Sequence, residues 1–231
     1  MALLGKAALA MWWDLAPEMK ADFEHWHSHE HFPERMGIPG FRRGSRWRSA
    51  TGGDGIFVMY ELEAYETLSS SPYLARLNAP TPWSTKMMPH HRNMVRSQCV
   101  VLESSGGGVA ANGVTVRLSP GERDGDDLRA SLKSLVGDLA MKPGLVGAHL
   151  LEHRTPDIRA TVEQKLRGGA DQAAQWVLVA CGYDARTLDA LSKNELCADS
   201  LAERGAAAGA VSAMYELAHS ATPGDVSKGS V

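Results

Sequence analysis

The order of hydrophobic and polar positions predicts the same series of elements twice along the chain. Alternating apolar residues indicate strands, and apolar residues spaced by three or four positions indicate helices. In the first half we expect strand, helix, strand, strand, helix and strand at residues 6–15, 17–38, 41–51, 56–62, 65–77 and 94–103. The second half repeats this order at residues 114–118, 126–140, 145–152, 175–182, 185–204 and 210–218. The sequence therefore predicts an α+β protein made of two tandem ferredoxin-like β-α-β-β-α-β repeats.

Glycine and proline mark the boundaries of these repeats. A Pro-Gly pair follows the first helix of each half, at residues 39–40 and 143–144, and this echo favours an ancient duplication. A glycine-rich linker after residue 105 separates the halves. We expect one domain at residues 1–108, a second at 113–221, and a disordered tail at 222–231.

Two segments do not fit either repeat. Residues 78–92 are rich in proline and are expected to form an irregular connection. Residues 161–174 are polar and rich in glycine, alanine and glutamine, and they interrupt the second hairpin. The sequence leaves open whether this second segment is a mobile flap or disordered.

Each predicted sheet has one face for its helices and a second apolar face that must also be covered. Two such antiparallel sheets can pack face to face and form an α+β barrel. The sequence does not decide whether the barrel closes within one chain or between two copies, and we expect a homodimer.

Composition limits the classes of partner. The 231 residues are 44% hydrophobic and 22% charged, with a formal net charge of −3 and a pI near 6.3. This balance lacks the clustered basic surface of a nucleic-acid-binding protein. No stretch reaches the ~18 apolar residues that a membrane-spanning helix needs. The three cysteines have neither metal-ligand nor redox spacing, which is typical of a cytoplasmic protein.

Candidate chemistry is concentrated at residues 25–35, where four of the nine histidines lie within seven residues. On a regular α-helix, His27, Glu30, His31 and Glu34 would share one face. In the first of three interpretations, His31 is a general acid/base, since imidazole titrates near neutral pH. Glu30 or Glu34 would assist His31, and Arg35 would stabilise an oxyanion or a carboxylate. No cofactor would be needed.

In the second interpretation, His27 and His31 bind a divalent metal. Residues 27–31 match H-x-x-E-H, in which two histidines bind zinc and the glutamate, here Glu30, acts as the base. His90 or His91 would supply a third ligand. A haem is also compatible, because one axial histidine is enough and has no spacing signal.

In the third interpretation, the histidines form a solvated helix face and the chain is a non-catalytic binding or accessory protein. Trp26 and Phe32 would then belong to the core. His25 and His29 fit this interpretation best, because they lie away from the face that carries Trp26 and Glu30.

Aromatic residues predict the walls of a pocket. Trp12 and Trp13 are neighbours on one strand, so one must face the helices and the other the space between the sheets. A pocket between the sheet and the first helix would favour an apolar or aromatic ligand. The residues expected to bind substrate are Trp13, Trp26, Tyr60, Trp83 and His91.

The stretch from Trp26 to Trp47 resembles a family signature. It reads Trp26-x-x-x-Glu30-His31-x-Pro33-Glu34-Arg35, followed by Ile38-Pro39-Gly40-Phe41 and Arg46-Trp47. This pattern is similar to that of the EthD-like group in the dimeric α+β barrel superfamily. The sequence departs from the group at His27, where an aromatic residue is usual, and the second half lacks the motif.

The resemblance implies a barrel fold and association through sheet faces. Members of the superfamily include isomerases, cofactor-free monooxygenases, decarboxylases and haem enzymes, so the resemblance alone does not fix the chemistry. We expect a small-molecule catabolic enzyme, a lyase, isomerase or related catalyst. It would act by cofactor-independent acid/base chemistry on an apolar or aromatic carbonyl substrate.

Overall fold

The computed structural model of the chain describes residues 3–121, 125–168 and 171–226. Its first-half strands are β1 (Ala7–Asp14), β2 (Phe41–Ser49), β3 (Gly55–Leu62) and β4 (Arg92–Gly106). Its second-half strands are β5 (Asn112–Leu118), β6 (Leu145–His153), β7 (Trp176–Gly182) and β8 (Val211–Ala221). The helices are α1 (Lys20–Trp26), α2 (Phe32–Met36), α3 (Ser71–Asn78), α4 (Pro82–Met87), α5 (Gly125–Met141), α6 (Val162–Leu166), α7 (Ala185–Lys193) and α8 (Ala198–Glu203).

The strands form one closed antiparallel barrel in the order β1-β3-β2-β8-β5-β7-β6-β4. Around this barrel each half contributes four adjacent strands. Their order is β4-β1-β3-β2 in the first half and β8-β5-β7-β6 in the second, so the two halves have the same topology. The halves are joined where β2 pairs with β8 and where β4 pairs with β6. The predicted α+β barrel of antiparallel ferredoxin-like sheets is confirmed. Because the barrel closes within one chain, its closure needs no second copy, and the expected homodimer stays a prediction.

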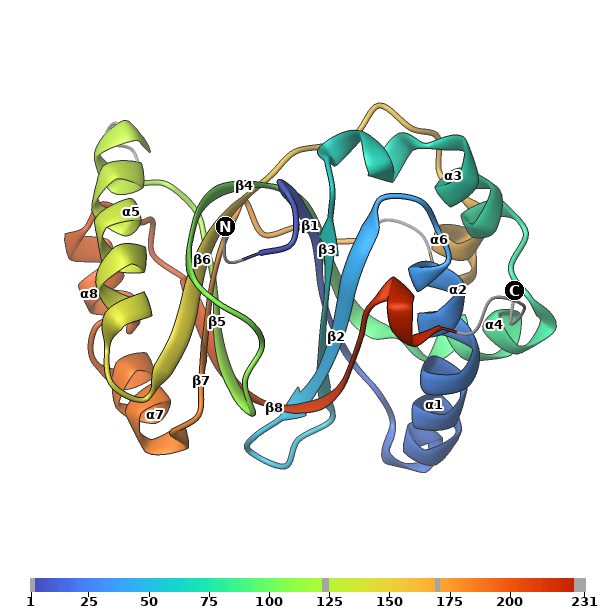
Figure 1. The fold of residues 1–231 in the computed structure, drawn as a ribbon, viewed down its shortest axis with the longest axis horizontal. Helices are drawn as coiled ribbons and strands as arrows, with labels where there is room; N and C mark the ends of the chain where they lie inside the picture. The colour runs from blue at the N-terminus through green and yellow to red at the C-terminus, as the bar shows by residue number, and fades with distance from the viewer. Residues whose placement is uncertain (1–2, 122–124, 169–170, 227–231) are drawn as a thin grey trace.

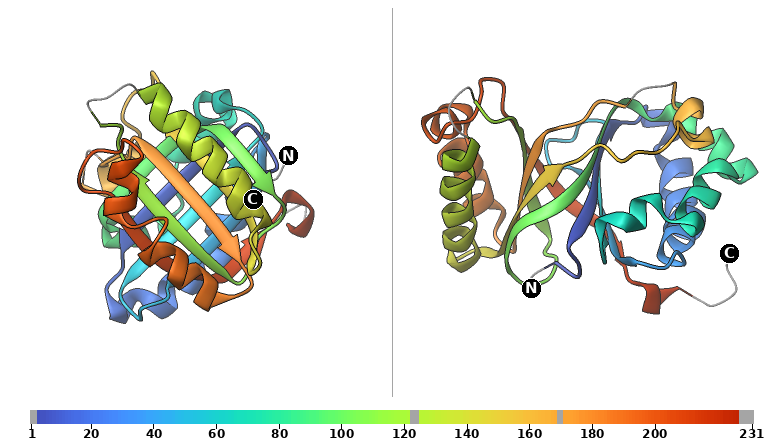
Figure 2. Two further views of the ribbon diagram at one scale, coloured as in Figure 1. Left: turned by 90° about the vertical axis from the view of Figure 1, so that its left-hand side faces the viewer. Right: turned by 90° about the horizontal axis from the view of Figure 1, so that it is seen from above.

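Helices cover two opposite outer sides of the barrel (Figures 1 and 2). On one side α1 to α4 pack on the first-half strands, and on the other α5, α7 and α8 pack on the second-half strands. The short helix α6 belongs to the second half of the chain but lies against α3, among the first-half helices. The second half therefore contributes one segment to the helical layer of the first.

Three buried apolar clusters correspond to these layers: one under each set of helices and one inside the barrel. Trp13 faces the helices and Trp12 faces the barrel interior, as strand alternation predicts. Inside the barrel the Phe57 ring stacks between Trp12 and Trp47, at centroid distances of 5.0 and 5.1 Å.

One glycine sets how closely the first helical segment approaches the sheet. A Cβ atom at Gly44 would lie 2.6 Å from a ring carbon of Phe32 and 2.9 Å from a ring carbon of Tyr60. Because glycine has no side chain, α2 can rest directly on β2 and β3 at this point. This close packing fixes the helix that carries the candidate chemistry.

Two expectations about local structure are wrong. Residues 78–92 contain α4 and a 3-10 turn at Met88–His90 rather than an irregular connection. Pro82 and Pro89 occupy first helical turns, where a missing N–H costs little, and the Thr81 hydroxyl caps α4 by accepting from the Ser84 N–H. The single helix expected at 185–204 is two helices, α7 and α8, which are separated at Asn194 by non-helical dihedrals of φ −114° and ψ −87°.

The segment left open between a flap and disorder, and part of the tail expected to be disordered, are both structured in their described residues. Within residues 161–174, α6 is capped by the Thr161 side chain, and Ala174 exchanges hydrogen bonds with the Ser97 hydroxyl. Residues 169–170 lie outside the described residues. The expected disordered tail is wrong for residues 222–226, because Thr222 and Asp225 form a capping box around a 3-10 turn. Residues 227–231 lie outside the described residues.

Among the described helices, none combines the length and the apolar character needed to cross a membrane.

Candidate functional site

The histidine-rich stretch is not a regular α-helix. Residues His27–His31 form a π-helical turn between α1 and α2, and the Phe32 N–H donates to the His27 carbonyl five residues earlier. Pro33 contributes to this break, because it has no N–H to donate to the His29 carbonyl. Single π turns inside helices are frequent at functional sites.

The wider turn changes which side chains share a face. His27 and His31 are both buried against the sheet, with ring centroids 5.3 Å apart. Glu30 turns the other way, toward α4. Its carboxylate accepts hydrogen bonds from the Trp26 indole at 3.1 Å, the Thr81 hydroxyl at 2.6 Å and the Ser84 hydroxyl at 3.3 Å. The shared face that an α-helix would give to His27, Glu30, His31 and Glu34 is therefore not formed.

A cavity lies between this helical segment and the sheet of the first half. It holds about 440 Å³ of space free of protein atoms, counting its mouth. It is lined by Leu9, Met11, Trp13, His27, His31, Arg35, Tyr60, Tyr73, Leu77, Met88, His91, Met94, Arg96, Glu163 and Arg167. Only Glu163 and Arg167 come from the second half of the chain, on and just after α6.

Four of the lining residues each carry a buried polar side-chain atom without a hydrogen-bond partner among the described residues. These atoms are the Nδ1 atoms of His27 and His31, the Tyr60 hydroxyl and the Trp13 indole nitrogen. Buried polar groups are nearly always paired in native proteins, because an unpaired one costs about 1–3 kcal/mol. Their concentration at one cavity indicates a site for a ligand that supplies the missing partners.

Burial keeps the histidines of this cavity uncharged. Desolvation lowers the pKa of His31 well below its usual value, and the positive charge of Arg35 lowers it further. Desolvation also lowers the pKa of His27 strongly, with Arg46 as the next cause. The pKa of His91 falls to about 3, chiefly through burial and then through Arg167. All three imidazoles are thus neutral at pH 7.

His91 has a defined orientation. Its Nδ1 lies 3.2 Å from the carbonyl oxygens of both Met87 and Met88, so this nitrogen carries the hydrogen and donates it. The other ring nitrogen is then the one with the lone pair. The His91 ring packs on Trp13 with centroids 4.8 Å apart.

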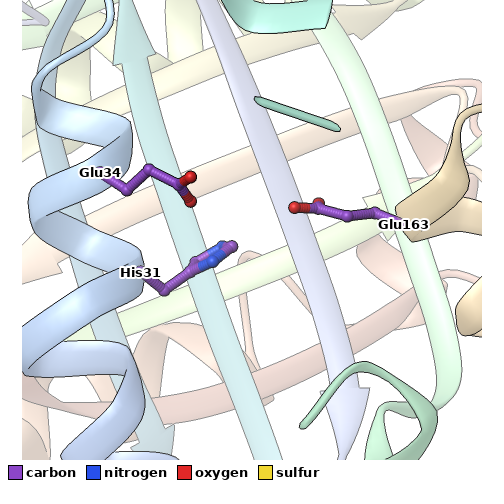
Figure 3. Close-up of side chains that lie close together, drawn as sticks. All are labelled: His31, Glu34 and Glu163. Atoms are coloured by element: carbon purple, nitrogen blue, oxygen red, sulfur yellow. The ribbon is translucent and has the colours of Figure 1, made fainter. Parts of the chain in front are cut away.

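A buried cluster of ion pairs borders the cavity beside His31. The Arg35 guanidinium is 3% exposed and lies 2.6 Å from a carboxylate oxygen of Glu163 and 3.0 Å from one of Glu34. Burial by itself would lower the pKa of Arg35, but the carboxylates of Glu163 and Glu34 raise it overall. Burial raises the pKa of Glu34. Figure 3 shows the Glu34 and Glu163 carboxylates pointing toward each other beside the His31 ring.

The structure brings together most of the residues that the sequence singled out. His27, His31, Arg35, Trp13, Tyr60 and His91 line the cavity. Glu34 lies behind Arg35 as its ion-pair partner. Trp26 is buried behind His31, with ring centroids 4.5 Å apart.

Two of the singled-out residues lie elsewhere. Glu30 bonds to α4 and does not line the cavity, so it is not placed to act as a base there. Trp83 packs against the exposed His25, with ring centroids 5.1 Å apart, and is also outside the lining. Both residues stabilise the contact between α4 and the first helix instead.

Sequence reasoning missed four polar residues of the site: Tyr73, Arg96, Glu163 and Arg167. Tyr73 and Arg96 belong to predicted elements but carry no motif. Glu163 and Arg167 lie in the segment 161–174, for which a flap was one of two expectations. The expectation that this segment folds over a ligand was the one sequence feature that could have pointed to these two residues.

The described residues also contain one group with the composition of a metal site. Ligand atoms of His31, Glu34 and Glu163 lie within 4.8 Å of one another. This set differs from the expected pair of His27 and His31, and Arg35 bonds to both of its carboxylates.

The buried histidines predict that acid destabilises the fold. Their ordinary pKa is 6.5 and burial lowers it, so below pH 6.5 the unfolded chain binds more protons than the folded one. Stability is therefore expected to fall as the pH drops from 6.5 toward the lowered values. At pH 5 each fully buried histidine should cost about 2 kcal/mol.

Urea unfolding at pH 7.5 and pH 5 checks this expectation. His91→Gln should lose about 2 kcal/mol less than the wild type between the two pH values, because it removes one such histidine. An equal loss in the two proteins would contradict the prediction.

Comparison with known proteins supports the fold. No protein-family model matches the chain, and no curated protein matches it significantly. Similar solved structures include a monooxygenase-like protein from Fusobacterium nucleatum, with a TM-score of 0.63 and 9% identity over 95% of this chain and 96% of that one. An anthrone oxidase-like protein has a TM-score of 0.63 and 13% identity over 97% and 96%. A monooxygenase-like protein from Lactobacillus acidophilus has a TM-score of 0.60 and 7% identity over 95% and 97%.

These alignments extend over both halves of the barrel. The chain thus has the fold of ferredoxin-like α+β barrel proteins, with the barrel closed by one chain. Its histidine-lined cavity lies on the helical side of the first half.

Proposed function

We propose that this protein is a small-molecule enzyme that moves a proton on a substrate bound in the histidine-lined cavity, without a metal or an organic cofactor. The observation that carries this proposal is the set of four unpaired buried polar atoms around one cavity. A carbonyl-bearing substrate would pair the two donors among them, the Trp13 indole N–H and the Tyr60 hydroxyl, because its oxygen accepts from N–H and O–H groups.

His31 is the proposed base. Its imidazole is neutral at pH 7 and its Nδ1 has no partner among the described residues. The Tyr60 hydroxyl and the Trp13 indole N–H are the proposed donors to the substrate oxygen that gains negative charge when the proton leaves. Burial raises the pKa of Tyr60, which keeps this hydroxyl protonated.

Arg35 supplies positive charge near this anion, and Glu34 and Glu163 hold its guanidinium in place. The role proposed for Glu34 is thus to position Arg35 rather than to assist His31. Glu30 positions the helix through its bonds to α4.

The apolar part of the lining suits an aromatic substrate. Leu9, Met11 and Trp13 form its floor on β1, and Leu77, Met88 and Met94 lie around them. We propose an aromatic or carbonyl-activated C–H as the site of proton removal. Return of the proton to another atom would give isomerase chemistry, and loss of a neighbouring group would give lyase chemistry.

The same first step would also serve oxygenation. A carbanion at an activated CH₂ group can react with O₂ to give a carbonyl group and water, and this reaction needs no further electron donor. The names of two similar structures, monooxygenase-like and anthrone oxidase-like, suggest anthrone as a probe. Membership of the EthD-like group is part of the same proposal and rests on the motif at residues 26–41.

Proton exchange on anthrone tests the proposal. The wild-type protein is incubated with anthrone in D₂O without oxygen, and loss of the CH₂ proton signal is followed by NMR. The exchange rate should rise in proportion to protein concentration and should be unaffected by a chelator. Exchange at the rate of buffer alone would contradict the proposal.

A metal-dependent enzyme is the second candidate, and the group of His31, Glu34 and Glu163 favours it. A metal would have to displace Arg35 from both carboxylates, and it would then polarise a substrate oxygen as a Lewis acid. Elemental analysis of untagged protein, together with exchange that a chelator abolishes, would support this candidate over the first.

A further inference from the structure

The charged groups around the cavity sum to zero but are unevenly distributed. Three guanidinium groups line it, those of Arg35, Arg96 and Arg167. Arg35 is paired with two carboxylates, and Arg167 lies 2.7 Å from a carboxylate oxygen of Asp171. Arg96 forms no ion pair with any acidic side chain that the structure describes.

Arg96 is instead held by a neutral partner. Its Nη2 donates to the Tyr73 hydroxyl at 2.9 Å. That hydroxyl accepts from Arg96 and keeps its own hydrogen to donate. The pair therefore offers N–H and O–H donors with a net charge of +1 at one end of the cavity.

The sheet sets the distance between this end and the proposed reaction centre. Arg96 on β4 pairs with Met11 on β1, and Leu9 on β1 pairs with Tyr60 on β3. Adjacent strands are about 4.8 Å apart and each residue rises about 3.4 Å, so two strand spacings and a two-residue offset along β1 separate the Arg96 and Tyr60 backbones by roughly 12 Å. The side chains of Leu9 and Met11 form an apolar floor between them.

We propose that the substrate of this cavity is a monoanionic aromatic carboxylic acid. Its carboxylate binds Arg96 and the Tyr73 hydroxyl, and its ring lies over the apolar floor toward His31. The planar guanidinium matches a carboxylate with two parallel hydrogen bonds. A dianionic phosphate would call for a second unpaired cation, which the described lining does not supply. The carboxylate site is independent of the proposed function. Only the placement of the ring beside His31 rests on that function.

Binding of 1-naphthoate, compared with the neutral 1-naphthamide, tests the inference by calorimetry. The two probes share a ring system and differ in charge. The wild type should bind 1-naphthoate about ten- to a hundred-fold more tightly than 1-naphthamide. Arg96→Gln should remove this preference, weakening binding of 1-naphthoate far more than that of 1-naphthamide. Arg129→Gln, an exposed arginine on α5, is the matched control and should behave as the wild type.

Tyr73→Phe provides a second variant that keeps the charge and removes one donor. It should weaken 1-naphthoate binding several-fold with little effect on 1-naphthamide. Equal binding of the two probes by the wild type, absence of binding by both, or an unchanged preference in Arg96→Gln would overturn the inference.

These experiments are separate from the test of proton transfer. 1-Naphthoate has no acidic C–H, so its binding does not depend on catalysis. His31→Gln should retain the preference for 1-naphthoate even if it loses all exchange activity. A protein that prefers the anion but exchanges no protons would support the substrate class and contradict the proposed function.

Discussion

His31→Gln is expected to lower the rate of proton exchange on anthrone by about a hundred- to ten-thousand-fold, the usual contribution of a positioned acid/base group. Glutamine keeps a polar side chain of similar reach but has no basic nitrogen. His31 is 7% exposed and its ring lies against the Trp26 ring, so the substitution changes the chemistry of the cavity more than its shape.

The pH profile of the wild type provides an independent readout. Because burial lowers the pKa of His31 well below 6.5, the base stays neutral through neutral and mildly acidic pH. The exchange rate should therefore stay level as the pH is lowered through 6.5, and fall only below it. A rate that halves near pH 6.5 would identify a solvated base and contradict this assignment.

His29→Gln is the matched control for this variant. His29 lies on the same helical segment but is exposed, with its ring 4.8 Å from that of His25. It should exchange protons at the wild-type rate. Equal losses in the two variants would indicate a general effect on the helix rather than the removal of a base.

Arg35→Met is expected to lower the free energy of unfolding by about 3–5 kcal/mol, because it leaves two buried carboxylates without their counterion. Glu34 and Glu163 are 5% and 2% exposed, so water cannot replace the lost guanidinium. Arg76 is the nearest remaining cation, at 3.8 Å from Glu34, but its side chain is 41% exposed. Chemical denaturation of the variant and the wild type measures the difference.

Two further variants isolate the cause of this loss. Arg48→Met breaks the ion pair with Glu216, in which both side chains are about half exposed, and it should cost less than about 1 kcal/mol. The triple variant Arg35→Met, Glu34→Gln, Glu163→Gln should recover much of the stability, since no buried charge remains unpaired. If the triple variant were no more stable than Arg35→Met, the unpaired carboxylates would not be the cause.

The same ion pairs connect the two halves of the chain. Glu163 lies 128 positions after Arg35, and α6 places it over the cavity of the first half. Thr161 and Glu163 are both buried there, although the surrounding sequence is polar. The second half, which lacks the histidine-rich motif, thus completes the site of the first through this short segment.

Sequence reasoning selected His31 and Arg35 as catalytic candidates and Tyr60 and His91 as binding candidates, and the structure places all four on the lining of one cavity. The same reasoning misplaced Glu30, because the spacing of a regular α-helix puts this residue on the face of His31, whereas the π turn directs it to α4. A periodicity argument assumes one helix geometry, and a local change of hydrogen-bond pattern cannot be read from apolar spacing.

The sequence by itself determined the order of the elements, the repeat and the alternation that places Trp12 and Trp13 on opposite faces of their strand. These features follow from local preferences and from the period of each element, which depend on residues close in the chain. Only the tertiary structure decided that the barrel closes within one chain, and that α6 delivers Glu163 to Arg35. Both depend on contacts between residues more than a hundred positions apart, for which a single sequence carries no periodic signal.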